Sequence, residues 1–520
     1  MRVAMICAGS VAGALAVCGW APFGWMPLAL LSYAVLFWLL QRDAGAGLAL
    51  SIGLAFGLGL HAAGHGWMFT TLRTKVGLSA PMAVVGTLVF LGYLALFTAL
   101  PCALTNALMR RRTSARQAVD VLSFAALLTL GEWLRSVLFN GFTSLSIGYV
   151  TLDTWLAGFA PIGGMYLSGF VVLLLAGLLG RAVGSTSAAL SGTGIGSVIL
   201  VAGWALGRVD WTQPVGAPLS FRLIQSDVAQ ARKFDLRYEA EYTRRVADLI
   251  MQTPADIVAT PETTFTSFLN ELPGDLLPRL QQFSQRTGSH VFLGVAMAAA
   301  NSDGHNSVLQ ISPDPVSEGL ARYDKIRLMP FGEYSPTGFG WFTNLLSIPL
   351  KDMSAGPPQQ APLRLAKAGT SVGIGTLICH EDMFGRDAAA WADSANLLLN
   401  PTNLAWFDGT MAIDQRLQVA RMRSLEVGRP MLRVANTGTT AQIDSHGAVV
   451  SEIPAHAQGV LSGSVQAVSG STPYARAGDA VALTLCGLGL LPALWSARRA
   501  RPRPGHGERL VSRPATTRHG

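Results

Sequence analysis

Residues 371–382, SVGIGTLICHED, predict a buried strand that runs directly into a polar turn. Cys379 follows seven small or apolar residues, and His380, Glu381 and Asp382 come after it. Because α/β enzymes often hold a nucleophile where a buried strand meets a turn, Cys379 is a candidate nucleophile. A free thiol with a pKa of ~8.5 is only a few per cent thiolate at neutral pH, so it needs a base. On position alone, a buried core cysteine remains the simpler interpretation.

Short apolar runs and helical stretches alternate on both sides of Cys379. Strands are expected at 221–228, 255–262, 290–298 and 395–403, helices at 237–252, 275–287 and 414–427, and a late hairpin at 431–450. This alternation predicts a layered α/β domain. We place the domain at residues 215–470. It cannot contain an internal disulfide, because Cys379 is its only cysteine.

Two acidic residues and one lysine also fall at the ends of expected elements. Glu262 ends the strand-like ADIVATPE, Lys325 lies in ARYDKIRLMPFGEY, and Glu333 follows eight residues later. Strand ends converge in α/β sheets, so these side chains can meet Cys379. A carboxylate can accept the thiol proton, and a lysine can stabilise the oxyanion of a tetrahedral intermediate. Taken one at a time, each is more simply a solvated surface residue.

Lysine is scarce in this chain. The 39 basic residues include only five lysines, which are Lys75, Lys233, Lys325, Lys351 and Lys367. An ammonium is a compact charge that suits a single oxygen, whereas a guanidinium suits carboxylate or phosphate. A lysine retained among so many arginines therefore invites a functional explanation.

The composition indicates a membrane protein. Half of the residues are hydrophobic and only 13% are charged, against roughly a quarter in an average soluble protein. This excludes a disordered chain and argues against an ordinary soluble enzyme. Of the 31 acidic residues, five precede residue 215. The charge asymmetry divides the chain into a membrane part and a water-facing part.

A membrane helix needs roughly 20 mostly apolar residues. Such stretches occur at 3–19, 23–40, 48–69, 81–108, 119–139, 164–179, 187–206 and 479–495. We therefore expect a multi-span α-helical membrane bundle of about eight helices. About seven spans lie in residues 1–214, and residues 471–520 hold the last span and a basic tail. The first span is not interpreted as a cleaved signal peptide, because further spans follow at once.

The arginines predict the orientation of the spans. Arginine-bearing loops and the tail are expected on the cytoplasmic side, at Arg42, Arg110, Arg111, Arg112, Arg116, Arg181 and residues 498–518. This favours both termini in the cytoplasm and residues 215–470 in the periplasm of a Gram-negative cell. A short or re-entrant first segment is one adjustment that we allow. The formal charge of +8 can suggest nucleic acid, but we interpret the basic tail as flanking the membrane and expect no nucleic-acid partner.

Two features of the membrane part leave alternatives open. Residues 140–161 are too polar and glycine-rich for a clean span, so we expect a loop that lies at the membrane surface or dips into it, or else a plain connector. Its aromatic residues Phe142, Tyr149 and Trp155 suit an interface. His61 and His65 have helical i, i+4 spacing and could bind a metal, but packing is the favoured interpretation.

Several motifs now carry a family resemblance. TPET around Glu262, YDKIRLMPFGEYSP around Lys325 and LICHEDMF around Cys379 resemble the Glu–Lys–Cys core of the nitrilase superfamily. PFGEY, NLAWF at 403–407 and QVARMRSLEVGRPMLRVANTG at 418–438 resemble apolipoprotein N-acyltransferases more narrowly. So do WAPFGW at 20–25 and GFTSLSIGY at 141–149. The resemblance covers nearly the whole chain.

The resemblance implies a nitrilase-like αββα sandwich outside the membrane and a two-step acyl transfer. A phospholipid would donate an acyl chain to Cys379, and a diacylglyceryl apolipoprotein would accept it. Glu262 would be the general base and Lys325 the oxyanion stabiliser. Glu333, Glu381 and His380 would support them. The resemblance implies no metal and no organic cofactor. Apolar arms at 331–334 and 341–346 are expected to guide acyl chains within the membrane lipid.

The sequence also departs from the family pattern. His380 replaces a usual tyrosine, Phe234 a tryptophan, Leu404 an aspartate, and Thr143–Ser144 a Pro-Trp pair. These departures bear on substrate preference and lid packing, and they leave the triad intact. Two rival functions remain open: a membrane-tethered amidase in which water resolves the thioester, and a non-catalytic lipoprotein-binding or membrane-assembly factor.

Overall fold

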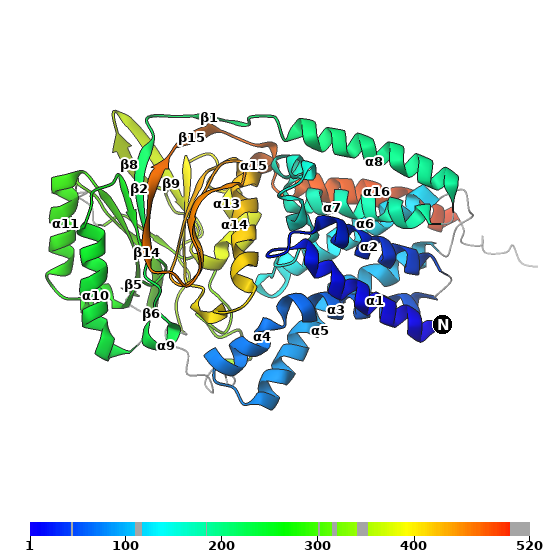
Figure 1. The fold of residues 1–520 in the computed structure, drawn as a ribbon, viewed down its shortest axis with the longest axis horizontal. Helices are drawn as coiled ribbons and strands as arrows, with labels where there is room; N and C mark the ends of the chain where they lie inside the picture. The colour runs from blue at the N-terminus through cyan, green and yellow to red at the C-terminus, as the bar shows by residue number, and fades with distance from the viewer. Residues whose placement is uncertain are drawn as a thin grey trace, which may run out of the picture.

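The structure is a computed structural model, and it shows a helical bundle joined end to end with a two-sheet domain (Figure 1). It describes residues 1–42, 45–109, 117–183, 185–233, 235–299, 302–314, 320–340 and 352–499. The chain enters the two-sheet domain from the end of α8 and returns to the bundle at α16.

Apolar helices form the bundle in the described part of the chain. They are α1 (Arg2–Ala16), α2 (Met26–Gln41), α3 (Gly45–His65), α5 (Ala80–Met109), α6 (Gln117–Val137), α7 (Ala160–Ala182), α8 (Thr186–Leu206) and α16 (Ala480–Arg499). By length and composition, six helices among the described residues can cross a membrane, whereas Met26–Gln41 and Ala480–Trp495 are shorter. The expected membrane bundle is confirmed, and the count of about eight spans stays a prediction.

The bundle helices alternate in direction. Gly53 of α3 packs against Cys102 near the end of α5, and Gly177 near the end of α7 packs against Val121 near the start of α6. The alternation places the end of α2 and the end of α7 beside the N-terminus, far from the two-sheet domain (Figure 1). Arg42 and Arg181 therefore share one end without a re-entrant first segment, and that adjustment is unnecessary. The arginines at 110–116 and in the tail lie outside the described residues.

Two sheets packed face to face form the second domain. The first has the order β14 (Gly459–Val465), β2 (Leu219–Gln225), β3 (Ile257–Ala259), β5 (His290–Ala299), β6 (Ser302–Ile311) and β7 (Arg322–Asp324), with β4 (Phe265–Phe268) also on β5. The second has the order β13 (Val449–Ile453), β12 (Thr440–Ile443), β11 (Met431–Ala435), β10 (Leu397–Thr402), β9 (Thr370–Thr376) and β8 (Leu363–Lys367). Strands β2, β3 and β5 pair in parallel, as do β9, β10 and β11.

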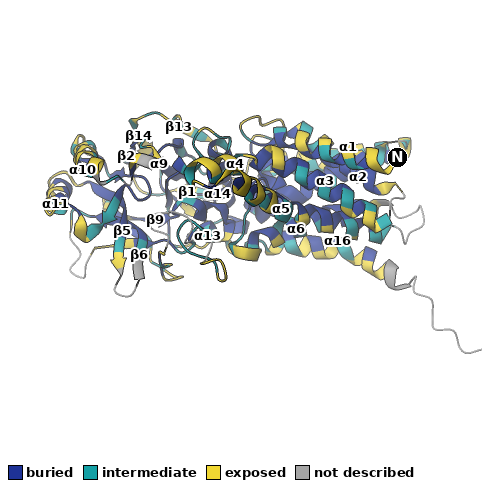
Figure 2. Cartoon of the chain, turned by 90° about the horizontal axis from the view of Figure 1, so that it is seen from below, coloured by how far each residue is buried: buried dark blue, intermediate teal, exposed yellow. Residues whose placement is uncertain are grey.

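The core of this domain lies between the sheets. Leu223 and Phe292 of the first sheet pack in one cluster with Ile374 and Leu398 of the second. Helices α10 (Leu236–Met251) and α11 (Leu276–Thr287) cover the outer face of the first sheet, and α13 (Gly385–Ala389) and α14 (Ala412–Val427) cover the second (Figure 1). The outer surfaces of α10 and α11 are exposed, whereas the strands behind them are mostly buried (Figure 2). The expected αββα sandwich is confirmed.

Helix α14 joins the sandwich to the bundle. Its Val419 and Met422 belong to the same buried cluster as the bundle helices. Gln418 Nε2 donates a hydrogen bond to the main-chain oxygen of Tyr149 at 3.1 Å. Residues 143–152 are buried at this junction, a burial that the polar composition of 140–161 did not predict. The position of this segment at the membrane surface stays a prediction. Tyr149 is buried, while Trp155 is exposed as an interfacial residue would be.

Candidate active site

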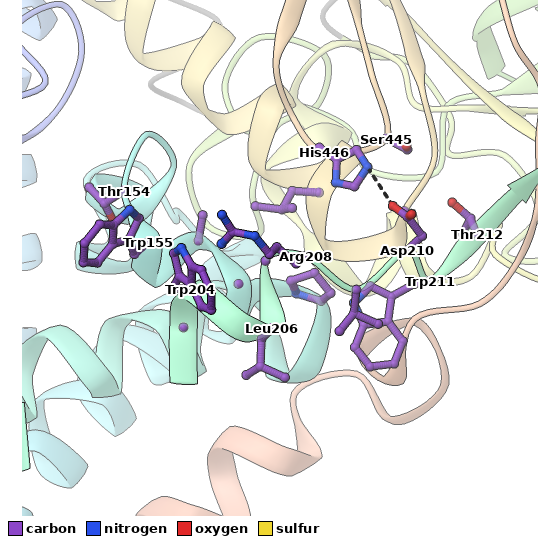
Figure 3. A pocket seen from close by; sticks show the side chains of 18 residues that line it. Thr154, Trp155, Trp204, Leu206, Arg208, Asp210, Trp211, Thr212, Ser445 and His446 are labelled. Carbon is purple, nitrogen blue, oxygen red and sulfur yellow. Dashed lines mark ion pairs between the residues drawn. The ribbon is translucent and has the colours of Figure 1, made fainter. Parts of the chain in front are cut away.

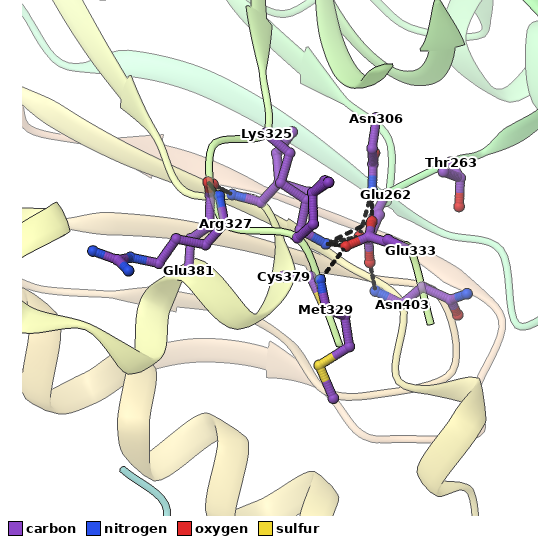
Figure 4. A network of polar contacts seen from close by, with 12 residues as sticks. Glu262, Thr263, Asn306, Lys325, Arg327, Met329, Glu333, Cys379, Glu381 and Asn403 are labelled. Carbon is purple, nitrogen blue, oxygen red and sulfur yellow. Dashed lines mark hydrogen bonds and ion pairs between the residues drawn. The ribbon is translucent and has the colours of Figure 1, made fainter. Parts of the chain in front are cut away.

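Glu262, Lys325 and Glu333 form one ionic cluster beside Cys379 (Figure 4). Glu262 follows β3, Lys325 follows β7, and Glu333 lies in the loop beyond it. Lys325 Nζ is 2.8 Å from Glu262 Oε1 and 2.9 Å from Glu333 Oε1. Lys325 is only 2% exposed. Its charge is therefore poorly screened and acts strongly on neighbouring groups.

The cluster keeps its charged groups ionised. Burial alone would lower the pKa of Lys325, but the Glu262 and Glu333 carboxylates outweigh it and raise this pKa well above its usual value. Burial opposes ionisation of Glu262, but the ammonium of Lys325 outweighs it and lowers the pKa of that carboxyl. The site therefore presents a carboxylate that can accept a proton and a cation that can stabilise an oxyanion.

Neutral donors fix both carboxylates. Asn306 Nδ2 donates to Glu262 Oε1 at 2.8 Å and to Glu333 Oε1 at 2.6 Å. The backbone N–H of Asn403 donates to Glu262 Oε2 at 2.9 Å, and that of Met329 to Glu333 Oε2 at 2.7 Å. Asn306 was not anticipated from the sequence, because the strand that carries it was not expected.

Cys379 begins the turn η8 (Cys379–Met383), and two residues separate it from the end of the second sheet's strand β9. Its φ of +50° places a non-glycine residue in the left-handed region, a strain that is common at functional sites. Arg416 Nη2 and Asn400 Nδ2 donate to its carbonyl oxygen at 3.0 and 3.3 Å. Burial and the nearby Glu262 carboxylate raise the pKa of the thiol to about 11, although Lys325 opposes them. A thiol with so high a pKa would need a general base to act as a nucleophile.

Glu381 connects the Cys379 turn to the Lys325 loop. Its carboxylate accepts hydrogen bonds from the backbone N–H of Ile378 at 2.6 Å and of Ile326 at 2.7 Å. It also accepts from the N–H of Arg327 and from the hydroxyl of Tyr323, each at 3.1 Å. Burial raises the pKa of Glu381 to about 7, against the effect of the backbone donors. One buried side chain thus holds together the two loops that carry Cys379 and Lys325.

Replacing Glu381 with alanine is expected to destabilise this site. The variant leaves the buried N–H of Ile378 and the partly buried N–H groups of Ile326 and Arg327 without their acceptor. A buried unsatisfied group costs about 1–3 kcal/mol. We expect the free energy of unfolding to fall by about 3 kcal/mol or more and the activity of the site to fall with it. Thermal unfolding of purified protein in detergent measures the first effect. Glu452→Ala, which removes an exposed carboxylate on β13, is the matched control; equal stability of both variants would contradict the assigned role.

The family departures have defined surroundings where the structure describes them. Thr143 Oγ1 donates to the main-chain oxygen of Met383, four residues after Cys379, at 2.8 Å. The buried ring of His380 packs edge-on against Phe384, and buried Leu404 packs at Gly438. Phe234 and residues 341–346 lie outside the described residues.

The two histidines of α3 lie within hydrogen-bonding distance of each other. His61 Nδ1 and His65 Nδ1 are 3.1 Å apart, and His65 Nε2 is 3.1 Å from Ser144 Oγ. Within the described ranges, no group of three His, Cys, Asp or Glu side chains could hold a metal ion. The pair is therefore a packing and hydrogen-bonding feature of the bundle.

A separate cavity of about 430 Å³ opens where the bundle meets the sandwich (Figure 3). Trp155, Trp204, Arg208, Asp210 and His446 are among its lining residues. The guanidinium of Arg208 lies 3.7 Å from the centre of the Trp204 ring. The cavity contains none of the Glu262, Lys325 and Cys379 side chains, so it is distinct from the ionic cluster.

Comparison with known proteins identifies the domain first. Residues 223–474 match the carbon-nitrogen hydrolase family, and residues 12–178 match the apolipoprotein N-acyltransferase N-terminal domain. A solved CN-hydrolase superfamily protein from Xanthomonas campestris aligns with 48% of this chain and 91% of its own, at 18% identity and a TM-score of 0.37. The family match over residues 223–474 alone identifies the sandwich as a carbon-nitrogen hydrolase domain, and this domain is attached to a membrane bundle.

Full-length relatives then identify the family. The chain is 38% identical over 94% of its length to an apolipoprotein N-acyltransferase of Ralstonia nicotianae, covering 92% of that protein. It is 35% identical over 94% of its length to one of Nitrosomonas europaea, covering 97%. The chain belongs to the apolipoprotein N-acyltransferase family and is an acyltransferase.

Proposed function

We propose that Cys379 carries an acyl chain as a thioester between a phospholipid and the N-terminal amine of a diacylglyceryl apolipoprotein. The observation that carries this proposal is the buried Glu262–Lys325–Glu333 cluster beside a strained cysteine. The names of the relatives imply a lipoprotein acceptor. Glu262, Lys325 and Cys379 are the proposed catalytic residues, supported by Glu333, Glu381 and His380.

The first step forms the thioester. Cys379 Sγ attacks an ester carbonyl of the phospholipid while Glu262 accepts the thiol proton. Lys325 stabilises the oxyanion of the tetrahedral intermediate. The intermediate then collapses, the lysophospholipid oxygen leaves, and it takes the proton back from Glu262.

The second step forms the amide. The lipoprotein amine attacks the thioester carbonyl while Glu262 accepts an amine proton, and Lys325 again faces the oxyanion. Collapse breaks the C–S bond, and the proton on Glu262 returns to the leaving thiolate. The same base and cation serve both half-reactions, so one site is sufficient.

Contacts with the membrane part support lipid substrates. Asn140 Nδ2 donates to the main-chain oxygen of Leu328 at 2.8 Å, in the loop that follows Lys325. Thr143 contacts the turn that follows Cys379. The segment between α6 and α7 therefore reaches both loops that carry the proposed site. In the loop that follows Lys325, the rings of Phe331 and Phe339 meet edge to face with their centres 5.6 Å apart. This apolar pair suits an arm that guides acyl chains. Residues 341–351, which continue the loop, lie outside the described residues.

We place the protein in the inner membrane with residues 215–470 in the periplasm, between bundle segments 1–214 and 471–520. A reporter that is active only in the periplasm should be active when fused near Gly304 and silent when fused after Arg503. The physical reason is that loops carrying arginine are retained on the cytoplasmic side of the membrane. Activity only in the second fusion would reverse the orientation.

The decisive functional experiment is rescue of a strain depleted of its own N-acyltransferase. Growth with triacylated lipoproteins supports the proposal. A membrane-tethered amidase would form the thioester but release free fatty acid, and a non-catalytic binding factor would form no thioester. Mass spectrometry of Cys379 and of a lipopeptide product separates these alternatives.

A further inference from the structure

A second lysine lies at the site without a part in the steps above. Lys233 ends the short helix α9 (Gln230–Lys233) and is only 5% exposed. Its Nζ donates to the main-chain oxygen of Glu262 and to Thr263 Oγ1, both at 3.0 Å. It is one of five lysines in the chain.

Burying this ammonium is costly. Both of its hydrogen-bond acceptors are neutral, and among the described residues no carboxylate oxygen forms an ion pair with it. A buried charge without an ion pair pays a large desolvation cost. Burial accordingly lowers the pKa of Lys233 to about 8. Fold stability alone therefore does not explain an ammonium here.

Lys233 contacts a strained turn of the backbone at Thr263. Thr263 is β-branched, yet its φ is +42°, a conformation that costs on the order of 1–3 kcal/mol. Lys233 holds the carbonyl before this residue and the hydroxyl on it. The turn that it holds directs the Glu262 carboxylate toward Lys325.

Lys233 also adds charge to the site. The groups that face Glu262 are Lys325 and Glu333 from the loop after β7, Cys379 from η8, and Lys233 from α9. Arg416 of α14 faces Cys379 from the other side. A positive charge at Lys233 favours the carboxylate of Glu262 and the thiolate that develops on Cys379.

We propose that Lys233 is a positioning residue for acyl transfer, which holds the Glu262–Thr263 turn and supplies a second positive charge beside the nucleophile. This proposal rests on the proposed thioester mechanism. Its ammonium acts through Glu262 and Cys379 and does not bind the substrate. A charge role makes the contribution depend on pH, whereas a purely structural role does not.

The test is the rate of thioester formation by full-length protein with labelled phospholipid, from pH 6 to pH 9.5. Lys233→Met is expected to be about tenfold slower at pH 7. Loss of a nearby positive charge shifts the pKa of a thiol or carboxyl group by about one unit, which is a factor of about ten in its ionisation. The defect should shrink above pH 8, where Lys233 of the parent protein loses its own proton. Lys233→Arg, which keeps the charge, should be faster than Lys233→Met at pH 7.

Lys367→Met is the matched control, because Lys367 pairs with Asp256 at the domain surface, away from the cluster. It should keep the parent rate. A defect of Lys233→Met that is the same at every pH, or no defect, overturns the proposal. If Lys233→Met does not accumulate, Lys233→Gln gives the same comparison. Absence of thioester in the parent protein would instead refute the thioester mechanism itself.

Discussion

Cys379→Ala is expected to abolish acyl transfer, with a loss on the order of 10⁴-fold or more. The variant removes the only atom that can carry the acyl chain in the proposed mechanism. The fold should persist, because Cys379 is at the edge of the sheet core and alanine leaves its backbone contacts in place. Incubation with phospholipid labelled in the acyl chain, followed by mass spectrometry, measures the adduct.

Cys18→Ala is the control for this variant. Cys18 is partly exposed and lies in the bundle, between α1 and α2, so its removal should leave thioester formation unchanged. Near-normal transfer by Cys379→Ala would show that the nucleophile is another group.

Lys325→Ala is expected to lower the rate of thioester formation by about 10²–10³-fold, the usual cost of removing an oxyanion donor. The effect should be on the transition state more than on substrate binding, because the negative charge develops only as Sγ attacks. Removal also leaves Glu262 and Glu333 close together with no cation between them. Repulsion between the two carboxylates raises the pKa of Glu262 and further weakens the base at neutral pH.

Lys325→Arg is expected not to rescue this loss. A planar guanidinium on a different stem cannot place one N–H as the ammonium does between two carboxylates at 2.8 and 2.9 Å. The measurement is thioester yield at matched membrane levels of each variant. Near-normal yield from Lys325→Arg would show that only a positive charge is needed, and near-normal yield from Lys325→Ala would remove this lysine from the catalytic set.

Glu262, Lys325 and Cys379 could be singled out from the sequence because each follows a strand or a strand-like run. Apolar runs that end in polar residues are local features, and the carboxyl ends of parallel strands meet at one edge of a sheet. The structure brings Glu262 and Lys325 within 2.8 Å. Glu333 was also placed correctly near the lysine, since only eight residues separate them.

The contributions of Asn306 and Lys233 depend on long-range packing. Asn306 lies on β6, whose mixed polar sequence SDGHNSVLQI does not resemble a buried strand, and it reaches the site only through pairing with β5. Lys233 reaches Glu262 because α9 folds back over the end of β3. Scarcity of lysine was the one available signal for Lys233.

The burial of residues 143–152 was missed for a related reason. Their polar and glycine-rich composition is typical of an exposed loop, since a buried loop must satisfy its backbone groups. Here the partners come from distant side chains: Glu132 accepts from the N–H of Ile147 at 3.0 Å, and Gln418 donates to Tyr149. No sequence pattern within the loop itself predicts these distant partners.

The most direct test of the mechanism is a pulse and chase on one preparation of full-length protein. The pulse loads the protein with a labelled acyl chain from phospholipid, and the chase adds a diacylglyceryl lipopeptide with a free N-terminal amine. The label is expected on Cys379 after the pulse, and during the chase it should pass to the lipopeptide amine in equal amount, while an N-acetylated lipopeptide leaves it on the cysteine. Product formed without label ever residing on Cys379, or label released as free fatty acid at the same rate with either lipopeptide, would contradict acyl transfer through this thioester.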